Sequence, residues 1–217
     1  MPHLTCVGST KAELLDIVAG YHADGIRNIM ALRGDPPKGE TEFVPCPDGL
    51  RYASDLIALI RQNFPDMCLG AGAYPEKHPE AASMEDDMRH LKIKADAGAS
   101  FLTTQLFFDN AHYFKFLDAC RALGIDLPVL PGLLPALSLA QVQRFGPMCG
   151  SSLPDALVEE LRAAEQDPDA AEQVGVTWAD RQIRDLLGRG APGVHLYILN
   201  RSAPAISLAG AFERTAA

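Results

Sequence analysis

Charged side chains follow a short apolar run early in the chain, where they could bind a cofactor or carry catalysis. Arg33, Gly34 and Asp35 come directly after the apolar residues 28–32. Arg33 offers a planar fork of donors for a phosphate or a heteroaromatic edge, and Asp35 can place negative charge beside a cofactor ring. Gly34 permits a close approach of the backbone. A mutual salt bridge between Arg33 and Asp35 is an equally good interpretation.

A second polar group follows the apolar residues 67–73. Tyr74, Glu76 and His78 alternate with other residues there, and two prolines make the turn rigid. Three titratable or aromatic side chains in five residues are more than a turn requires, so we expect a functional loop. A solvated polar loop is the alternative.

Gln105 is the polar exception in the apolar stretch "FLTTQLFF". A buried amide needs partners for both its donor and its acceptor groups. A site inside a barrel would supply them, and so would a hydrogen bond to a neighbouring strand. The sequence leaves both interpretations open.

Two later groups complete the candidates. Gln141 and Phe145 stand four residues apart on one helical face and could line the mouth of a site, although most such pairs are ordinary packing. In the last predicted strand, Tyr197 and Leu199 share one face. Arg201 follows just past its end, where a cation could hold a carboxylate.

A metal centre is the weakest of the chemical hypotheses. The donors that could meet at a barrel mouth are His3, Asp35, His78, Asp109 and His195. They show neither HxH nor HExxH spacing. The sequence also has no GxSxG motif, no Walker loop and no cysteine nucleophile motif. We therefore expect no metal and no chemistry of these three classes.

Composition favours one domain that acts on a small molecule. The chain has 217 residues, of which 47% are hydrophobic, enough to bury roughly 70% of its unfolded surface. The net charge of -9, without any Lys/Arg cluster, argues against nucleic acid or an anionic membrane as a partner. No apolar run approaches the length of a membrane span and no signal peptide is visible, so we expect a cytoplasmic protein. An assembly of identical chains is an open alternative.

The cysteines suggest neither a disulfide framework nor a zinc site. There are five, far apart and without a CxxC pair. We expect them to be reduced and mostly in the core.

Short apolar runs alternate with segments of helical period, which is the pattern of βα units around a parallel sheet. The spacing predicts strands at residues 3–7, 28–32, 67–73, 101–107, 127–130 and 194–199. Predicted helix starts include a capping box at Thr10 and Glu13 and a cap at Asp109. Helices are also expected from about residue 51, from Ser83 to Gly98, and at about 138–145, 154–164, 168–188 and 203–213.

The order of these elements indicates a (β/α)8 barrel with six of its eight βα units. Polar and Gly/Pro-rich segments are concentrated after the strands, where barrel enzymes place their sites. An open doubly wound sheet is the rival, but "CVGST" after the first strand has a single glycine and lacks the dinucleotide fingerprint.

Six blocks of the sequence together resemble the 5,10-methylenetetrahydrofolate reductase family. They are "PHLTC", "ALRGDPP", "AYPEKHPEA", "LKIKADAGASFLTTQLFFD", "PGLLP" and "HLYILNRS", in the family's usual order and spacing. The resemblance extends over essentially the whole chain. It implies a flavin-dependent barrel that uses FAD to transfer a hydride from NADH or NADPH to 5,10-methylenetetrahydrofolate. The product, 5-methyltetrahydrofolate, serves methionine synthesis in one-carbon metabolism.

The resemblance also implies site residues. Those that would surround FAD are His3, Arg33, Gly34, Asp35, Tyr52, Ala53, Ala73, Tyr74, His78, Asp87, His90 and Lys94. Asp35 would lie near both the flavin ring and the folate and stabilise cationic folate intermediates. Those that would contact the folate or the nicotinamide are Gln105, Gln141, Phe145, Tyr197, Leu199 and Arg201. From the sequence pattern alone, Asp87, His90 and Lys94 would be an ordinary solvated helix face.

In the family, two βα units precede the "PHLTC" block. The first strand ends in a glutamate of an "EFFPP"-like segment that protonates the folate, and the second ends in a threonine-tyrosine pair beside the flavin. Neither segment occurs in the 217 residues, and Glu76 is no obvious substitute. We expect a single truncated barrel domain over residues 1–217, explained by a late start codon or a degraded gene. An inactive or partner-dependent flavin- or folate-binding remnant is the alternative function.

Overall fold

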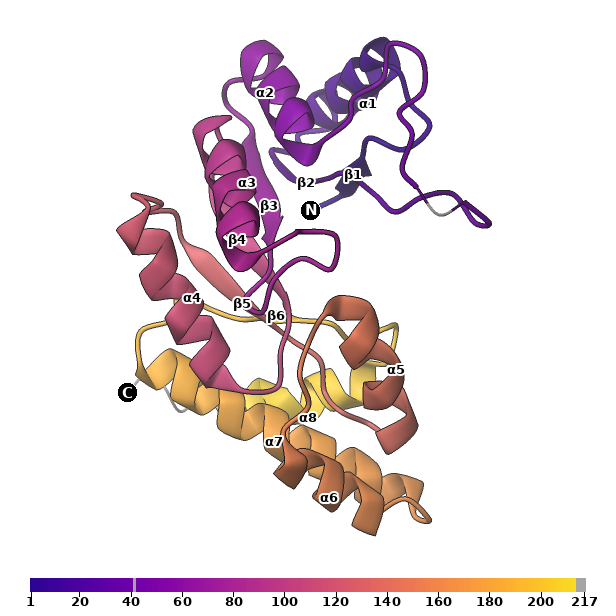
Figure 1. Cartoon of the computed structure of the whole chain (residues 1–217), viewed down its shortest axis with the longest axis vertical. Coiled ribbons are helices and arrows are strands. Elements are labelled where there is room, and N and C mark those ends of the chain that lie inside the picture. Colours follow the sequence, from indigo (N-terminus) through magenta and orange to yellow (C-terminus); the bar gives the residue numbers. More distant parts are fainter. Residues whose placement is uncertain (41, 214–217) are drawn as a thin grey trace. The chain divides into compact units, whose positions relative to one another are not determined.

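The computed structural model describes residues 1–40 and 42–213, which form alternating strands and helices (Figure 1). The strands are β1 (His3–Thr5), β2 (Asn28–Leu32), β3 (Cys68–Ala73), β4 (Phe101–Leu106), β5 (Val129–Leu133) and β6 (His195–Leu196). The helices are α1 (Lys11–Ala23), α2 (Ala53–Asn63), α3 (Met84–Asp96), α4 (Asn110–Ala122), α5 (Leu139–Cys149), α6 (Asp155–Ala163), α7 (Pro168–Gly188) and α8 (Ser202–Glu213).

The strands form one sheet in chain order, β1-β2-β3-β4-β5-β6. The pairs β1–β2, β2–β3 and β5–β6 are parallel, with His3 opposite Met30 and Met30 opposite Gly70. A helix follows every strand, and three helices separate β5 from β6. This is the topology of six consecutive βα units of a barrel, so the predicted fold class is confirmed.

The chain divides into two compact units. Unit 1 comprises residues 1–72 and 89–102, and unit 2 comprises residues 73–88 and 103–217. Each has its own buried core. The prediction of one domain over residues 1–217 stays a prediction.

In unit 1, α1 and α2 lie side by side and share apolar contacts (Figure 1). Leu14 and Val18 of α1 are fully buried, as are Leu56, Ile57 and Ile60 of α2. The neighbouring apolar residues of α1 are less buried, because Leu15 is half-buried and Ile17 is 37% exposed. Leu59 of α2 is likewise only half-buried. The sheet contributes the buried residues Ile29, Ala31, Leu69 and Ala71.

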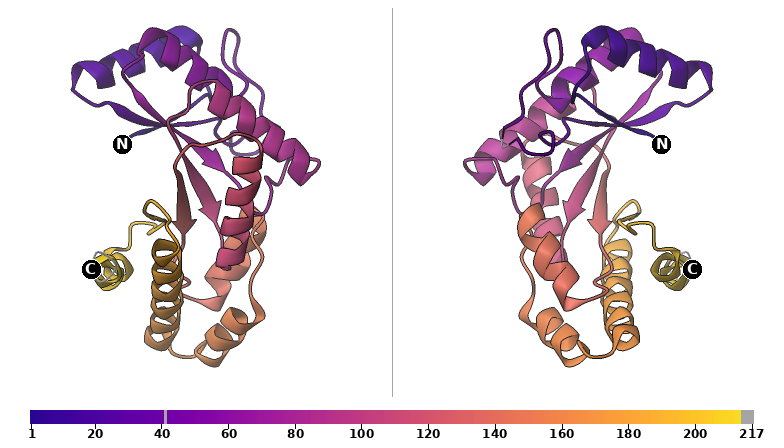
Figure 2. Two further views of the ribbon diagram at one scale, coloured as in Figure 1. Left: turned by 90° about the vertical axis from the view of Figure 1, so that its left-hand side faces the viewer. Right: turned by 90° about the vertical axis from the view of Figure 1, so that its right-hand side faces the viewer.

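In unit 2, helices α5 and α6 cover a cluster of apolar side chains. The cluster consists of Leu106, Phe108, Leu134, Ala136, Leu139, Val142, Leu157 and Leu161. Helix α7 packs against both α6 and α8, and the first of these pairings is seen clearly in Figure 2. Gly175 lets α7 lie against the backbone of the segment between β5 and α5, because a Cβ at Gly175 would lie 2.0 Å from the carbonyl oxygen of Ala136.

The predicted helix caps are confirmed. Thr10 accepts a hydrogen bond from the amide of Glu13, whose carboxylate accepts one from the amide of Thr10 in return. Asp109 accepts from the amide of Ala111. Gly98 follows α3 with a φ of 108°, a left-handed conformation that glycine adopts without steric cost. These local signals start and stop helices because they satisfy terminal amides and carbonyls.

The last strand is shorter than predicted. It comprises His195 and Leu196 alone, and the ladder continues only through the amide of Tyr197, which donates to the carbonyl of Leu133 over 2.8 Å. Leu199 and Asn200 have φ values of 47° and 63°, which no strand residue has. Tyr197 and Leu199 therefore do not share a strand face, as the alternation had suggested.

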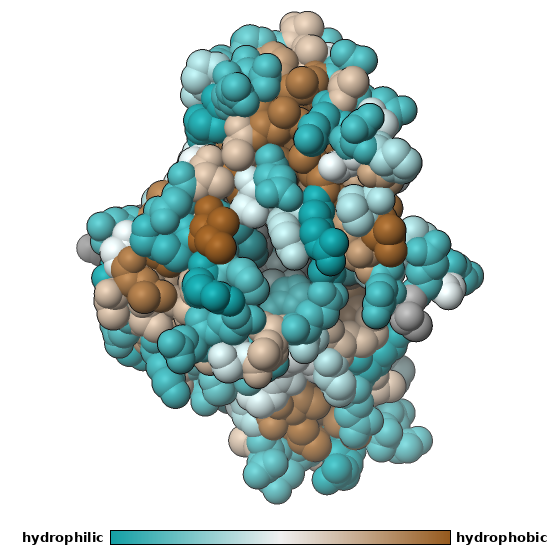
Figure 3. Space-filling model, turned by 45° about the horizontal axis from the view of Figure 1, so that its top comes forward, coloured by the Kyte–Doolittle hydropathy of each residue, from teal (hydrophilic) through white to brown (hydrophobic). Residues whose placement is uncertain are grey.

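The described residues contain no helix long and apolar enough to cross a membrane. All five cysteines are free; Cys6 and Cys120 are buried and the other three are half-buried. On the face shown in Figure 3, hydrophobic side chains form separate groups among hydrophilic ones. Large exposed apolar residues such as Val44 and Ile206 come from distant parts of the sequence.

Candidate functional site

Arg33, Gly34 and Asp35 lie directly after the carboxyl end of β2 in unit 1. Gly34 has a φ of 86°, and a Cβ there would lie 2.5 Å from a methyl carbon of Val7. No other residue fits this position without strain and a clash. The backbone at the end of β2 is therefore fixed by packing against the segment that follows β1.

Two contacts hold the Arg33 guanidinium. Its Nε donates to the carbonyl oxygen of Gly34 over 3.2 Å, and its central carbon lies 5.4 Å from the ring centre of Phe43. The ring contact is within the range of a cation–π interaction. Asp35 is exposed and takes part in neither contact. The salt bridge considered from the sequence stays a hypothesis.

The other unit 1 candidates have different environments. His3 is exposed in β1, Tyr52 is 53% exposed, and Ala53 is buried in the first turn of α2. The amide of Tyr52 donates to a carboxylate oxygen of Asp55 over 2.9 Å, which starts the helix. Cys6 lies close by, because its thiol reaches the carbonyl of Tyr52 at 3.5 Å.

Cys6 is a packed thiol. Burial raises its pKa to about 11, with a further rise from the Asp55 carboxylate and an opposing effect of Arg33. A thiol that stays protonated at neutral pH is a poor nucleophile. The Cys6 thiol also contacts the carbonyls of Leu32 and Tyr52, so it ties the end of β2 to the start of α2.

Helix α3 supplies two unit 1 candidates. His90 is exposed, whereas Lys94 is half-buried and its Nζ donates to the carbonyl oxygen of Gly72 over 2.9 Å. A Cβ on Gly72 would find only a methyl of Leu32, at 3.8 Å. The position of Gly72 is thus open on its side-chain side, and its carbonyl oxygen holds the Lys94 ammonium.

In unit 2, Ala73 ends β3 and the loop of residues 74–83 leads into α3. The rings of Tyr74 and His78 meet edge to face with centroids 4.4 Å apart. Asp87 accepts a hydrogen bond from the amide of His78 over 2.8 Å. Tyr74, His78 and Asp87, predicted as neighbours of one cofactor, are therefore brought together.

Glu76, in the same loop, has its carboxylate engaged. Its Oε2 accepts hydrogen bonds from both the amide and the hydroxyl of Ser152, and Nε2 of His112 lies 3.5 Å away. Its Oε1 is buried and has no hydrogen-bond partner among the described residues. The side chain is only 12% exposed. Glu76 is held in the protein and is not directed into open solvent.

Gln105 is half-buried near the end of β4. Its Oε1 accepts from the amide of the next residue, Leu106, over 2.9 Å, so its acceptor is satisfied locally and not by a neighbouring strand. Two residues earlier, the buried hydroxyl of Thr103 has no partner among the described residues. By strand alternation these two side chains share a face. That face carries the amide of Gln105 and a buried hydroxyl.

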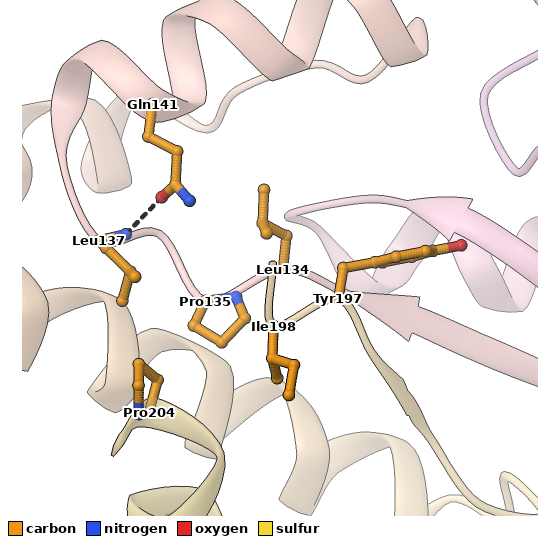
Figure 4. Close-up of a pocket in the computed structure, with 7 residues that line it drawn as sticks. All are labelled: Leu134, Pro135, Leu137, Gln141, Tyr197, Ile198 and Pro204. Atoms are coloured by element: carbon orange, nitrogen blue, oxygen red, sulfur yellow. Dashed lines mark hydrogen bonds between the residues drawn. The ribbon is translucent and has the colours of Figure 1, made fainter. Parts of the chain in front are cut away.

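A small hollow lies beyond the ends of β5 and β6 (Figure 4). It is lined by Leu134, Pro135, Leu137, Gln141, Tyr197, Ile198 and Pro204. Its volume of about 10 Å³ gives room for roughly one water molecule. The Gln141 Oε1 accepts from the amide of Leu137 over 2.7 Å. Sites that enclose a whole drug-sized molecule measure roughly 300–1,000 Å³. This hollow is therefore too small to hold a folate or one of its rings.

Tyr197 extends away from the other residues of the hollow (Figure 4) and donates from its hydroxyl to the carbonyl of Thr104 over 2.9 Å. Burial raises its pKa to about 12, with smaller contributions from Tyr74 and Cys149. Phe145 does not line the hollow. It packs against the apolar cluster under α5 and α6.

Leu199 and Arg201 lie in the exposed turn after β6. Leu199 is 51% exposed. Arg201 is 61% exposed, and its Nη2 lies 3.5 Å from the carboxylate of Glu172 on α7. The carboxylate beside this cation thus belongs to the protein itself.

No three His, Cys, Asp or Glu side chains gather as a metal site in the described part of the chain. The sequence pattern missed Ser152 and His112. Both contact Glu76, although they lie 76 and 36 residues further along the chain. No local signal marks such distant partners. It also missed Gly132, although a glycine within a strand indicates a close backbone approach.

Comparisons with known proteins identify the family of the chain. The family model described as methylenetetrahydrofolate reductase matches residues 1–209. The chain is 38% identical over 93% of its length to the 5,10-methylenetetrahydrofolate reductases of Pectobacterium carotovorum and Escherichia coli, and covers 65% and 66% of those proteins. It is 33% identical over 96% of its length to methylenetetrahydrofolate reductase (NADH) 1 of Arabidopsis thaliana, covering 37% of that protein.

A solved structure is similar in fold. It is a Clostridium thermocellum protein that binds two copies of 5-methyl-5,6,7,8-tetrahydrofolic acid, matched with a TM-score of 0.59 and 18% identity over 99% of this chain and 72% of that one. At this identity the likeness concerns the fold alone. The chain spans slightly less than two thirds of the bacterial relatives named above. The sequence matches show that the chain belongs to the methylenetetrahydrofolate reductase family.

Proposed function

We propose that this chain is the flavin-binding part of an enzyme that reduces 5,10-methylenetetrahydrofolate to 5-methyltetrahydrofolate with NADH or NADPH, in one-carbon metabolism and methionine biosynthesis. The observation that carries the proposal is family membership over residues 1–209, with Arg33, Gly34 and Asp35 following the carboxyl end of β2 and Tyr74 following that of β3. Barrel enzymes place catalysis at that end. A family member named for NADH and another named for NADPH leave both nicotinamides open.

The residues present fit FAD. Gly72 lies in open space, because a Cβ there would meet only a methyl of Leu32 at 3.8 Å, and a flat ring can use such close backbone approach. Arg33 and Lys94 offer donors to the polar and phosphate groups of the cofactor. The chemistry that FAD supplies when bound is the carriage of hydride between nicotinamide and folate.

Asp35 and Gln105 would act on the folate. Asp35 is exposed after β2, so its carboxylate can place negative charge beside a positively charged folate intermediate and stabilise it. The amide of Gln105 would read polar edges of the pterin, because its oxygen is already held by Leu106. Phe145 would act as an apolar wall, although its ring packs against the cluster under α5.

The test uses purified residues 1–217. We expect a yellow protein whose flavin loses its visible absorbance when NADH is added without oxygen. Folate turnover is measured in the same sample, because opening the folate ring needs a proton donor, whereas hydride transfer to flavin needs none.

Three outcomes would change the proposal. Full folate turnover by residues 1–217 would show that the chain supplies its own acid. Binding of FAD or folate without reduction by either nicotinamide would favour the non-catalytic or partner-dependent alternative. A colourless protein that takes up no added FAD would refute the flavin site.

A further inference from the structure

Three consecutive residues between α5 and α6 contact the loop of residues 74–83 and the end of β4. Gly150 caps α5 with a φ of 69°, and a Cβ there would lie 3.1 Å from the carbonyl oxygen of Lys77. Ser151 and Ser152 follow, each with its hydroxyl bonded to a different segment. We call residues 150–152 the latch.

Ser152 holds Glu76. Its amide donates to Oε2 of Glu76 over 3.0 Å, and its hydroxyl donates to the same oxygen. Two donors on one carboxylate oxygen fix the side chain more firmly than one, since bonds to a charged acceptor are the strong ones. The loop is therefore tied to the latch through Glu76.

His112 of α4 adds a third element. Its Nε2 lies 3.2 Å from the Ser152 hydroxyl oxygen. A hydroxyl has one proton, which Ser152 gives to Glu76, so His112 must donate in this contact and carry its proton on Nε2. The chain of donation runs from His112 to Ser152 to Glu76.

Ser151 contacts the end of β4 and not the loop. It is buried, and its hydroxyl donates to the carbonyl oxygen of Leu106 over 2.5 Å. Leu106 ends β4 directly after Gln105, whose side chain accepts from the same residue's amide. The latch therefore fixes the end of β4 as well as the loop.

Hydrogen bonds within the loop of residues 74–83 hold its residues in fixed positions, so that fixing Glu76 also fixes its neighbours. Glu80 donates from its amide to Nδ1 of His78 over 3.0 Å, and Asp87 holds the amide of His78. The ammonium of Lys77 donates to the carbonyls of His78 and Ala81. Lys77 has a φ of 100°, a conformation that persists only where surroundings enforce it.

We propose that Glu76 is a positioning residue, which through the latch holds Tyr74 and His78 in a fixed relation to Gln105. The inference rests on the proposed function only in assigning those three residues to flavin and folate. It gives Glu76 a role other than proton donation: its Oε2 accepts two hydrogen bonds from Ser152 and lies 3.5 Å from Nε2 of His112, and its Oε1 is buried.

The experiment compares Glu76→Ala, Glu76→Gln and Ser152→Ala in the full chain. The control is Asp167→Ala, which removes the cap of α7 in the same unit without touching the latch. Hydrogen exchange is measured without cofactor over residues 74–82. We expect exchange to rise by at least about tenfold in Glu76→Ala and in Ser152→Ala, and to stay unchanged in Asp167→Ala.

Glu76→Gln should restore much of the protection, because its amide oxygen can still accept from Ser152. Equal exchange over residues 74–82 in Glu76→Ala and in the control would overturn the proposal. If Glu76→Ala fails to fold, Ser152→Ala decides, since it removes one hydroxyl from an exposed residue.

Flavin titration separates this proposal from the proposed function. If the unaltered chain binds FAD, Glu76→Ala should weaken binding by about tenfold or more while its melting temperature falls no further than that of the control. If the unaltered chain binds no FAD, the flavin proposal fails and the exchange data alone decide on the latch.

Discussion

The hydroxyl of Tyr197 donates to the carbonyl oxygen of Thr104, and Gly132 lies beside both groups. A Cβ on Gly132 would lie 2.2 Å from that oxygen and 2.8 Å from the Tyr197 ring. The amide of Gly132 donates to the Thr104 hydroxyl over 2.8 Å. The packing at the end of β5 therefore requires a residue without a side chain at position 132.

Gly132→Ala should destabilise the protein by about 3 kcal/mol or more, because the clash is with backbone and cannot relax by a rotamer change. Gly20→Ala is the matched control. It lies inside α1 with nothing within 4 Å of a Cβ, and should stabilise by about 0.5–1 kcal/mol. Urea unfolding measures both. A Gly132→Ala protein as stable as the unaltered one would contradict the geometry.

Alkaline pH should weaken the fold through Tyr113 and Tyr197. Burial raises the pKa of each from 10.0 to about 12. Between those values the unfolded chain has released protons that the folded protein keeps, so stability falls as pH rises through this window. Below pH 10 the contribution is fully present.

The check is the urea midpoint at pH 9 and at pH 11, compared in the unaltered protein and in Tyr113→Phe/Tyr197→Phe. The urea midpoint of the double variant should fall less between pH 9 and pH 11 than that of the unaltered protein. At pH 9 each substitution should cost about 1 kcal/mol, because each hydroxyl donates to a main-chain carbonyl over 2.9 Å. An identical pH dependence in both proteins would exclude the two phenols as its source.

Lys94→Met should lower FAD affinity by at least about tenfold, if FAD binds as proposed, since it removes the ammonium beside the end of β3. Lys92→Met is the control on the same helix. Lys92 pairs with Asp96 at the surface, an interaction worth about 0–1 kcal/mol. Quenching of flavin fluorescence on titration measures both affinities. Equal affinities in the two variants would remove Lys94 from the site.

Most of the fold could be predicted from local signals. The capping box of Thr10 and Glu13 and the cap at Asp109 predicted two helix starts, because they satisfy amides of the adjacent turn. The predicted length of the last strand was wrong, because apolar alternation over residues 194–199 does not reveal the left-handed φ of Leu199. The alternation of apolar and polar residues concerns side chains. Strand pairing requires in addition that the backbone can form hydrogen bonds with the neighbouring strand.

The candidate site divides in the same way. Arg33, Gly34 and Asp35 could be predicted because a polar cluster after an apolar run lies at a strand end. The engagement of Gln105 with the amide of its own neighbour could not, since a sequence names an amide and not its partner.

The sequence by itself determined the family, the order of the βα units and the positions of the polar groups after the strands, because each depends on residue types at short spacing. Only the tertiary structure decided which of those groups are engaged. Glu76 is held by Ser152 and Tyr197 by Thr104, partners 76 and 93 positions away. Such contacts arise when distant segments pack together, and no local pattern encodes them.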